Sequence, residues 1–483
     1  MGILTVKEIA DMMDGEIIDG DPCITISDYS YNSKEGDSQT LFLPIVGENR
    51  DAHDFIPDAL SNGMIATVTE RGRVEENTEG MTYIAVDSTR DAIQRLGMRY
   101  RMCFSPKCVG ITGSVGKTTT KEMIAAALEG SKKVIKTEGN KNGQLGLPLM
   151  ALKTDENTEV LVLEMGVSII GEMERLAKIA RPDIAVVTNI GFSHVGNFGS
   201  QQNIRREKLG IINEMDENGI LLLNGENELL SELAPGSPTQ KDISELGLYE
   251  ETTEVMGNIR RLSYGLSKWC DFRAEDVVSD ATGSSFTFRY KDMEIPVRLK
   301  VCGSHNILNA VSALACAVLL DADMDAALKM LGDYEPLAMR GKIEKTENGT
   351  WLIDDSYNAS PDSMKSGLWL LSNAVNEGRK IAMLADMLEL GDYSEELHRL
   401  VGKYAAESKA DIIICVGKEA EFIADEAEKL SDKEIKSFET REEAEKYLLE
   451  TLKPGDCVLC KGSRGMQLDK TAKLIREAGG EKA

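Results

Sequence analysis

The chain has 483 residues, of which 42% are hydrophobic and 28% are charged, a composition typical of a globular protein with full cores. Its length suggests about three domains. The formal net charge of −26 argues against a nucleic-acid partner and against an anionic membrane surface, because both attract basic proteins. An anionic small molecule can still bind in a pocket that lysine, arginine, helix N-termini and metal ions make locally positive.

The sequence also indicates the compartment. The opening residues lack the basic and apolar segments of a signal peptide, and no apolar run reaches the ~18 residues of a membrane span. Nine scattered cysteines fit reduced thiols better than a disulfide framework, so we expect a cytoplasmic protein that is not a membrane protein. Cys457 and Cys460 have CxxC spacing. We interpret them as buried strand residues, with a metal or redox role as the alternative.

The first two predicted domains differ in pattern. Residues 1–104 alternate short predicted strands and helices and form a small N-terminal α/β domain. From Lys107 onward, apolar runs such as CVGIT, EVLVLEMG and IAVVTNI alternate with helical segments. Continuous apolar strands between helices predict a parallel sheet covered by helices on both faces. We assign residues 105–334 to this central domain.

The rest of the chain completes a three-domain α/β fold. Residues 272–300 contain predicted antiparallel strands, and residues 305–320 form a predicted buried helix. Residues 233–259 are polar, and we expect them to form an irregular surface insertion. Residues 335–483 again alternate apolar strands with helices, which predicts a Rossmann-like C-terminal domain.

Residues 110–120, GITGSVGKTTT, predict a phosphate-binding loop between a strand and a helix. Glycines allow backbone N–H groups to face phosphate oxygens, and the helix N-terminus adds partial positive charge. Lys117 supplies a full charge, and Thr118 supplies a hydroxyl for Mg²⁺. The loop is shorter than GxxxxGK[ST], because Ile111 occupies the position of the first glycine. The alternative is a glycine turn that caps a helix beside an exposed lysine.

Three further residues could act on the same ligand. Glu164 ends an apolar strand, and a carboxylate at the carboxyl end of a parallel strand faces the ligand crevice, where it can hold Mg²⁺. His194 lies in a glycine-bounded loop after another strand, which is unusual for a core histidine. Lys208 follows in a helical stretch, where a lysine by itself would be a solvated surface residue.

Polar groups also mark the start of the predicted helix at 305–320 and the strand ends of the C-terminal domain. Asn306 and Asn309 are three residues apart and share one helix face, where they can contact a base or a phosphate or cap the helix. Loops at 354–361 and 461–465 follow predicted strands. These loops would face the central domain across a cleft.

Taken together, these residues resemble the Mur ligase family, the ATP-dependent ligases that build the peptide stem of bacterial peptidoglycan. The resemblance covers nearly the whole chain. GSVGKTTT resembles the family's phosphate loop, EMG its Mg²⁺ glutamate, FSH its metal-site histidine, REK its carbamylated lysine and HNILNA its ATP-binding asparagines. Stretches at 139–148, 354–364, 384–398 and 461–468 resemble the branch that adds D-Ala-D-Ala, and the DNPR-type motif of the diaminopimelate-adding branch is absent.

The resemblance implies that ATP phosphorylates the terminal carboxylate of a UDP-N-acetylmuramoyl-tripeptide, and that the amine of D-Ala-D-Ala attacks the acyl phosphate. It implies two Mg²⁺ ions and a CO₂-derived carbamate on Lys208. The first domain would bind the UDP substrate and the third would close over ATP. We expect a monomer whose partners are these small molecules.

The implied site residues fall into four groups. The catalytic group is Lys117, Glu164, His194 and Lys208. The metal-binding group is Thr118, Glu164, His194 and Lys208 as its carbamate. The ATP-binding group is Gly113, Ser114, Gly116, Lys117, Thr118, Thr119, Asn140, Asn306, Asn309, Arg340 and Asp355. The substrate-binding group is His53, Tyr357, Asn358, Ser463 and Arg464.

The sequence departs from the family pattern in places and leaves two alternatives. Lys208 is followed by Leu209 and Gly210, where the family often has an acidic residue two positions after the lysine. Asp51-Ala52-His53 stands where the family usually has Asp-Gly-His. The alternatives are a related ligase that adds a single amino acid and a non-catalytic nucleotide-binding regulator.

Overall fold

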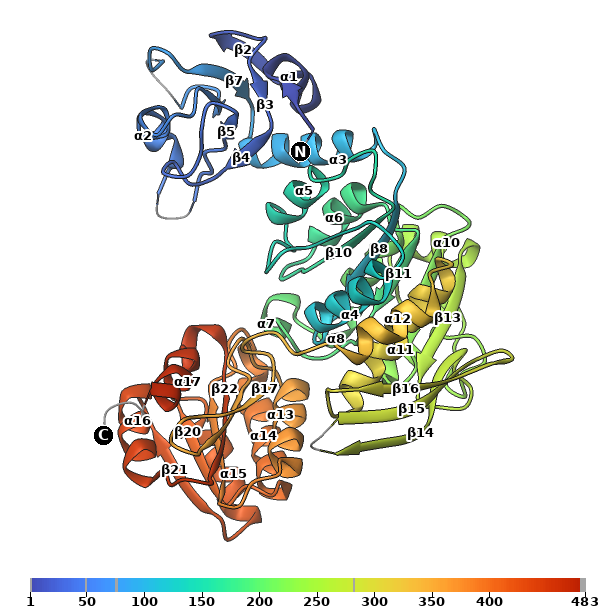
Figure 1. Ribbon diagram of the computed structural model, residues 1–483, viewed down its shortest axis with the longest axis vertical. Helices are drawn as coiled ribbons and strands as arrows, with labels where there is room; N and C mark the ends of the chain where they lie inside the picture. Colours follow the sequence, from blue (N-terminus) through green and yellow to red (C-terminus); the bar gives the residue numbers. More distant parts are fainter. Residues whose placement is uncertain (1, 48–49, 74–76, 281–282, 478–483) are drawn as a thin grey trace.

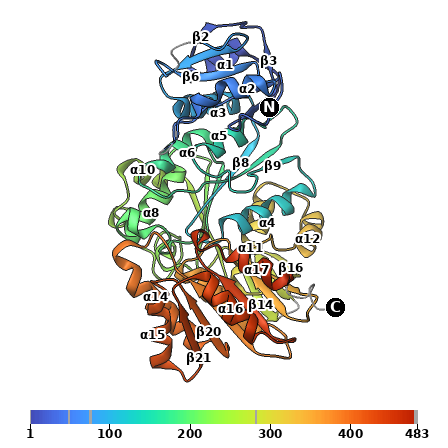
Figure 2. The same cartoon turned by 90° about the vertical axis from the view of Figure 1, so that its left-hand side faces the viewer.

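The computed structural model describes residues 2–47, 50–73, 77–280 and 283–477. Three main sheets define an N-terminal, a central and a C-terminal unit, which follow one another along the long axis of the molecule (Figures 1 and 2). The sheets lie within residues 1–104, 105–334 and 335–483, and we keep these domain boundaries as a proposal; the last six residues of the third range lie outside the described chain. None of the described helices is long and apolar enough to cross a membrane.

The N-terminal unit is built on a five-stranded sheet. α1 starts at a capping box, in which the Thr5 hydroxyl accepts from the Glu8 N–H and the Glu8 carboxylate accepts from the Thr5 N–H. The strand order is β2 (Glu16–Asp19), β7 (Thr82–Val86), β6 (Ala66–Glu70), β5 (Thr40–Phe42), β4 (Asp28–Ser30). The other elements are β1 (Leu4–Thr5), β3 (Thr25–Ile26), α1 (Val6–Met13), α2 (Ile56–Ser61) and α3 (Thr89–Arg101).

The central unit is a nine-stranded sheet that is parallel from β9 to β14 and antiparallel from β14 to β16, as the sequence predicts. Its order is β16 (Met293–Leu299), β15 (Gly283–Tyr290), β14 (Phe272–Asp280), β13 (Arg260–Gly265), β12 (Ile220–Asn224), β11 (Ile184–Val187), β8 (Lys107–Thr112), β10 (Val160–Glu164), β9 (Val134–Lys136).

Alternation along the strands supplies both faces of this sheet with apolar side chains. Val160 and Val162 of β10 share a core with α4, whereas Leu161 and Leu163 share a core with α5 and α6. The predicted buried helix is confirmed as α11. The helices of this unit are α4 (Lys117–Glu129), α5 (Gly146–Ala151), α6 (Glu172–Ala180), α7 (Val195–Phe198), α8 (Gln201–Leu209), α9 (Glu228–Ser231), α10 (Glu250–Asn258), α11 (Ser304–Leu319) and α12 (Met324–Gly332).

The prediction that residues 233–259 are irregular is wrong for the last third of the segment. Residues 250–258 form α10, which buries Thr252 and Met256 on one face because they are four residues apart. The chain before α10 is tied to α8, since Arg205 and Arg206 donate to the carbonyls of Leu246 and Gly247. The segment therefore packs onto the central unit.

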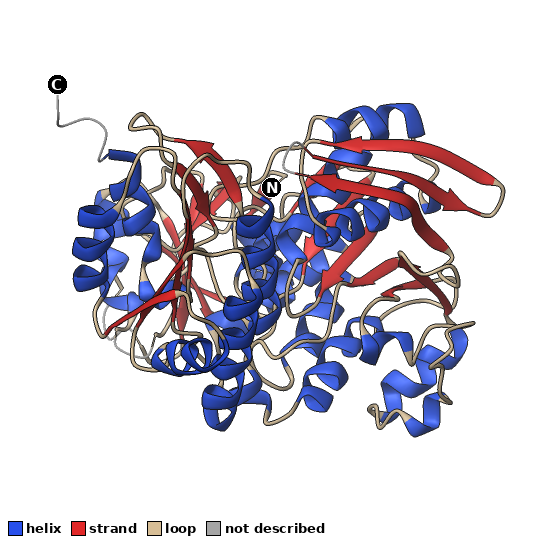
Figure 3. Cartoon of the chain, turned by 90° about the horizontal axis from the view of Figure 1, so that it is seen from below, coloured by secondary structure: helices blue, strands red, loops and turns tan. Residues whose placement is uncertain are grey.

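The C-terminal unit is a six-stranded sheet with helices on both sides, and its strands are parallel except for the β17–β18 pair (Figure 3). Its order is β17 (Lys342–Lys345), β18 (Trp351–Asp354), β22 (Cys457–Lys461), β19 (Lys380–Ala385), β20 (Ile412–Val416), β21 (Glu434–Phe438). Its helices are α13 (Pro361–Asn373), α14 (Ser394–Glu407), α15 (Glu421–Leu430), α16 (Arg441–Thr451) and α17 (Leu468–Glu477).

The interpretation of Cys457 and Cys460 as buried strand residues is confirmed. Both are fully buried in β22. Cys457 belongs to the core under α13 to α15, and Cys460 belongs to the core under α16 and α17. Because the two thiols lie on opposite faces of the sheet, they cannot bind one metal ion together.

The contact between α3 and α5 joins the N-terminal and central units. A Cβ at Gly97 would lie 2.7 Å from the Cα of Pro148, so the two backbones meet at a distance that only glycine permits. We predict that Gly97→Ala lowers the free energy of unfolding by about 1–3 kcal/mol, because the added methyl group pushes α3 away from α5. Urea denaturation followed by circular dichroism measures the change.

The matched control is Gly257→Ala in α10, where an added Cβ meets no atom within 4 Å. That substitution should change the free energy of unfolding by no more than about 1 kcal/mol, in the stabilising direction, since alanine favours helices over glycine. Equal effects of the two substitutions would contradict the close approach of α3 and α5.

Candidate active site

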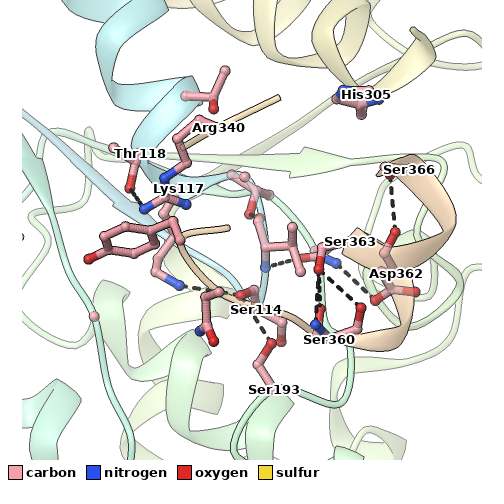
Figure 4. A pocket seen from close by; sticks show the side chains of 18 of the residues that line it. Ser114, Lys117, Thr118, Ser193, His305, Arg340, Ser360, Asp362, Ser363 and Ser366 are labelled. Carbon is pink, nitrogen blue, oxygen red and sulfur yellow. Dashed lines mark hydrogen bonds between the residues drawn. The ribbon is translucent and has the colours of Figure 1, made fainter. Parts of the chain in front are cut away.

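A cavity of about 500 Å³ lies between the central and C-terminal units. Its size suits a small ligand with several phosphates and rings. The central unit contributes the phosphate loop and the ends of β10 and β11, and the C-terminal unit contributes the chain after β18 together with Lys461. Figure 4 shows residues of both units around this space.

The loop between β8 and α4 has the geometry of a phosphate-binding loop. Gly113 has φ +147° and Gly116 has φ +86°, and the loop that they form leads into α4. Gly116 lines the cavity, whereas Gly113 does not. The chain after β11 holds the loop: Asn189 accepts the Ser114 N–H through its carbonyl at 3.0 Å and the Val115 N–H through its side-chain oxygen at 2.7 Å. The Thr188 hydroxyl donates to the Val115 carbonyl at 2.5 Å.

Lys117 is the first residue of α4, and its ammonium group donates to the Gly113 carbonyl at 2.7 Å. Burial lowers the pKa of Lys117, the Glu164 carboxylate opposes that shift, and the Arg340 guanidinium adds to it. The lysine lines the cavity together with Ser114, Gly116, Thr118 and Thr119, so the structure brings the predicted loop residues together. A bound anion here would face a full positive charge and the N-terminus of α4.

Glu164 is a buried carboxylate at the end of β10. Its Oε1 accepts from the Thr118 hydroxyl at 3.1 Å and from the Asn142 amide at 2.8 Å. Its Oε2 is also buried and has no hydrogen-bond partner among the described residues. A buried carboxylate oxygen without a donor fits a cation, and oxygen ligands of this kind suit Mg²⁺.

Two groups of the C-terminal unit reach this loop or the cavity beside it. Arg340 donates to the Thr118 hydroxyl at 3.1 Å, and its guanidinium lies over the Tyr357 ring at 3.9 Å. Asp355 lines the cavity and pairs with the buried Lys461 at 2.5 Å. Burial raises the pKa of Asp355, and the positive charge of Lys461 opposes the rise.

His194 lies at the contact between the two units. It has φ +62° and precedes α7, and its Nδ1 contacts the Glu389 carboxylate of the C-terminal unit. The Gly196 N–H donates to the Glu389 carbonyl at 3.0 Å, so the same two loops are joined through the backbone. Burial lowers the pKa of His194, and the Glu389 charge opposes that shift.

Lys208 in α8 is only 1% exposed and does not line the cavity. Its ammonium group has no hydrogen bond among the described residues. Burial lowers the pKa of Lys208 well below its usual range, and the charge of Lys117 lowers it further. Within the described chain, no three His, Cys, Asp or Glu side chains lie close enough together to hold a metal ion by themselves.

The predicted asparagines behave differently from one another. Asn306 and Asn309 both line the cavity; Asn306 donates to the Cys302 carbonyl, and Asn309 accepts from the Thr120 hydroxyl. Asn140 is exposed and does not line the cavity. The neighbouring Asn142 takes that place and contacts Glu164. Both asparagines lie in the stretch 139–148 that carries the family resemblance, and the sequence does not show which of the two faces the cavity.

The predicted substrate residues are only partly brought together. Tyr357 and Asn358 line the cavity, whereas Ser463 and Arg464 do not. Ser463 is buried and accepts from the Leu388 N–H, and Arg464 is exposed beside Asp469. His53 is buried in the N-terminal unit, where its ring nitrogens contact the Asp51 carboxylate and the Glu70 N–H.

Sequence reasoning missed several lining residues: Asn142, Glu172, His305, Asp362 and Lys461. Burial lowers the pKa of His305 to about 4, which keeps it neutral at neutral pH. His305 lies in the motif HNILNA and Asp362 lies in the stretch 354–364, so the family motifs located both segments. Only packing between units shows which side chains face the cavity.

Gly113 provides a direct test of the loop geometry. A Cβ at this position would lie 1.9 Å from the Thr188 hydroxyl, and the φ of +147° disfavours any other residue. We predict that Gly113→Ala weakens ATP binding about tenfold or more, because the strained loop costs about 1–3 kcal/mol. Isothermal titration calorimetry with ATP measures the change, and Gly257→Ala, remote from the cavity, should bind ATP as the unmodified chain does.

The chain is similar in sequence to known ligases. The family profile for the Mur ligase middle domain matches residues 111–317, and the profile for the Mur ligase glutamate ligase domain matches residues 339–464. The chain is 35% identical to the UDP-N-acetylmuramoyl-tripeptide–D-alanyl-D-alanine ligase of Bacillus subtilis, over 98% of both chains. It is 28% identical to the enzyme of that name from Escherichia coli, over 99% of both chains.

Solved structures of related ligases have the same fold over nearly the whole chain. A crystal structure of MurF from Acinetobacter baumannii superimposes with a TM-score of 0.85 at 27% identity, over 99% of both chains. The MurF ligase of Thermotoga maritima in complex with ADP superimposes with a TM-score of 0.78 at 29% identity, over 94% of this chain and 98% of that one. The likeness therefore includes all three units.

Proposed function

The chain belongs to the Mur ligase family, and on that premise we propose that it joins D-alanyl-D-alanine to a UDP-N-acetylmuramoyl-tripeptide with cleavage of ATP. The tripeptide carboxylate takes the γ-phosphate of ATP and becomes an acyl phosphate. The amine of the dipeptide then displaces phosphate and forms the new amide bond. The products are the UDP-muramoyl-pentapeptide of peptidoglycan precursor synthesis, ADP and phosphate.

The observation that carries this proposal is the cavity that the central and C-terminal units build together. Arg340 of the C-terminal unit donates to Thr118 of the phosphate loop, so a ligand in this cavity would contact both units. An acyl phosphate reacts readily with water, and a site between two closing domains excludes water while the second substrate is positioned. The chain is similar over all three units to ligases that share one enzyme name, and this similarity supports the choice of substrates.

ATP binds at the phosphate loop. Gly113 and Ser114 shape the loop, the backbone N–H groups at the start of α4 from Gly116 to Thr118 would face the phosphates, and Lys117 would supply the charge that stabilises the outer phosphates. Asn306, Asn309 and Asp355 line the same cavity, and we assign them to the adenosine part. Thr119 lies in the same loop, and we assign Asn142, which lines the cavity, to the outer phosphates in place of Asn140.

One Mg²⁺ fits beside Thr118 and Glu164, because Glu164 Oε2 is a buried carboxylate oxygen without a donor. A bound Mg²⁺ offsets the repulsion between the attacking carboxylate and the anionic γ-phosphate, which share the same charge sign. Thr118 and Asn142 fix the direction of the Glu164 carboxylate through its other oxygen. Arg340 fixes the Thr118 hydroxyl from the opposite side.

We assign the second metal position to His194 and to Lys208 as a carbamate. The chemistry of Lys208 fits this modification, because a lowered pKa increases the neutral fraction of the amine, and a neutral amine can add CO₂ to become an anionic oxygen ligand. As an unmodified cation it would repel both Lys117 and a metal ion. Glu389 contacts His194 Nδ1, and the described residues give His194 Nε2 no hydrogen bond.

The remaining proposed roles concern substrates. Tyr357 and Asn358 lie on the C-terminal side of the cavity, where the dipeptide would enter. Arg464 stays a second candidate for the dipeptide carboxylate, since a guanidinium suits that group and Arg464 is exposed. We keep the neighbouring Ser463 with it. His53 shapes the predicted UDP-binding loop through Asp51 and Glu70, and we retain the N-terminal unit as the UDP-substrate domain.

The activity is tested by phosphate release from ATP and Mg²⁺ with the UDP-muramoyl-tripeptide, with and without D-Ala-D-Ala. We expect release that requires both substrates and a pentapeptide product by mass spectrometry. Release with a single amino acid and a shorter acceptor would place the enzyme at another step. Absence of release with every acceptor, together with ATP binding, would favour a regulatory module.

The carbamate is tested by Lys208→Arg, which we predict to be folded and almost inactive because a guanidinium forms no carbamate. The unmodified chain should lose activity when CO₂ is stripped from the buffer and regain it with bicarbonate, whereas the variant should not respond. ¹³C NMR with labelled bicarbonate should show a carbamate signal that the variant lacks. Full activity of the unmodified chain without CO₂ would contradict this role.

A further inference from the structure

Asp362 is a carboxylate at the cavity that the preceding assignments leave without a role. It is the second residue of α13 in the C-terminal unit, and it faces the loop that carries Ser114 (Figure 4). Its Oδ2 accepts one long hydrogen bond, from the Asn189 amide at 3.4 Å. The described residues give it no ion pair.

The titratable neighbours of Asp362 do not neutralise it. Lys365, on the same helix, lies over the Tyr404 ring of α14, 5.2 Å from the ring centre. The surrounding protein raises the pKa of Asp362, and the charge of Lys365 opposes the rise, although the side chain stays open to the cavity. Asn189 and Ser114, which face it from the central unit, are uncharged.

The other acidic groups of the cavity lining are already engaged. Glu164 accepts from Thr118 and Asn142. Glu172 accepts from the Gln144 amide and from the N–H groups of Ser168 and Ile169. Asp355 is paired with Lys461. The free oxygen of Glu164, Oε2, is already assigned to Mg²⁺ above. Among the described lining residues, Asp362 is therefore a carboxylate that the assigned roles leave available to a positively charged ligand group.

A carboxylate at this position favours a cationic ligand group over an anionic one. It lies beside the phosphate loop, where it would repel the phosphates of ATP and of the acyl phosphate. The fold keeps room for it, because a Cβ on Gly191 would lie 2.3 Å from Asp362 Oδ2. The metal site proposed above uses Glu164 on the other side of the loop, and the described residues form no cluster of three metal-binding side chains that includes Asp362.

The second substrate supplies such a cation. A dipeptide reaches the site with its amino group protonated, and an ammonium group cannot attack a carbonyl carbon until it loses a proton. Resting on the function proposed above, we propose that Asp362 binds the ammonium group of the attacking dipeptide and accepts its proton. Asp362 then acts as the general base of the ligation step.

The step balances. The ammonium group transfers one proton to Asp362, and the neutral amine forms the C–N bond at the acyl carbon. The C–O bond to phosphate breaks, and the leaving phosphate takes the second proton of the amine. Asp362 returns its proton to the same phosphate, so that the amide and dihydrogen phosphate are formed and the carboxylate is restored. No oxidant or further reactant is required.

Hydroxylamine separates this role from earlier steps. It is already a neutral amine at neutral pH, so it traps the acyl phosphate as a hydroxamate without a base. We expect Asp362→Asn to lower dipeptide ligation by about 100-fold or more, the usual contribution of a general base. Hydroxamate formation from ATP and the tripeptide should stay within about threefold of the unmodified chain, as should its KM for ATP.

The pH profile provides a second readout. Below the pKa of the dipeptide amine, about 8, the neutral fraction rises about tenfold per pH unit. Dipeptide ligation by Asp362→Asn should follow that rise, because the variant depends on amine that is already neutral, whereas the unmodified chain should show a shallower dependence. Asp362→Glu should recover part of the ligation rate.

The control is Asp432→Asn, the same change at an exposed position of the same unit, which should leave both reactions unchanged. Equal losses of hydroxamate and pentapeptide in Asp362→Asn, or no loss of either, would overturn the proposal. If the unmodified chain forms hydroxamate but ligates a single amino acid, the substrate assignment fails. The same comparison with that amino acid then decides the role of Asp362.

Discussion

The buried carboxylate of Glu164 is the constraint on which the rest of the site depends. One of its oxygens accepts from Thr118 and Asn142, and the other is buried without a donor. A buried carboxylate oxygen without a donor is unfavourable unless a cation binds to it. The region beside the phosphate loop therefore favours binding of a cation. The two donors fix the direction from which that charge is bound.

Both outer units contact the elements that hold this carboxylate. The N-terminal unit reaches the loop that carries Asn142, because Tyr31 donates to the Leu145 carbonyl at 3.0 Å and Gln94 donates to Gln144. The C-terminal unit reaches Thr118 through Arg340. Each donor of Glu164, or the loop that carries it, is therefore in contact with an outer unit.

Although the chain is strongly acidic, positively charged side chains are concentrated at the cavity. The formal net charge is −26, yet the cavity lining contains Lys117, Arg340 and Lys461, and the N-terminus of α4 also faces the cavity. These groups favour an anionic nucleotide at one part of the cavity. Asp362 adds a negative charge on the C-terminal side, where an ammonium group would approach.

The sequence by itself determined the features that depend on neighbouring residues. The phosphate loop, the strand that ends at Glu164, the antiparallel strands after residue 272 and the burial of Cys457 and Cys460 all follow from local patterns of glycine, charge and apolar alternation. These patterns act within one element, so their physical consequences can be read along the chain.

Only the tertiary structure decided which side chains meet. It placed Asn142 rather than Asn140 at the cavity, turned Ser463 inward, gave both ring nitrogens of His53 partners inside its own unit, and ordered residues 250–258 as a helix. It also brought Asp362 opposite Gly191, 171 positions earlier in the chain. Such contacts depend on how separate units pack, and no local periodicity encodes the distance between two residues so far apart in sequence.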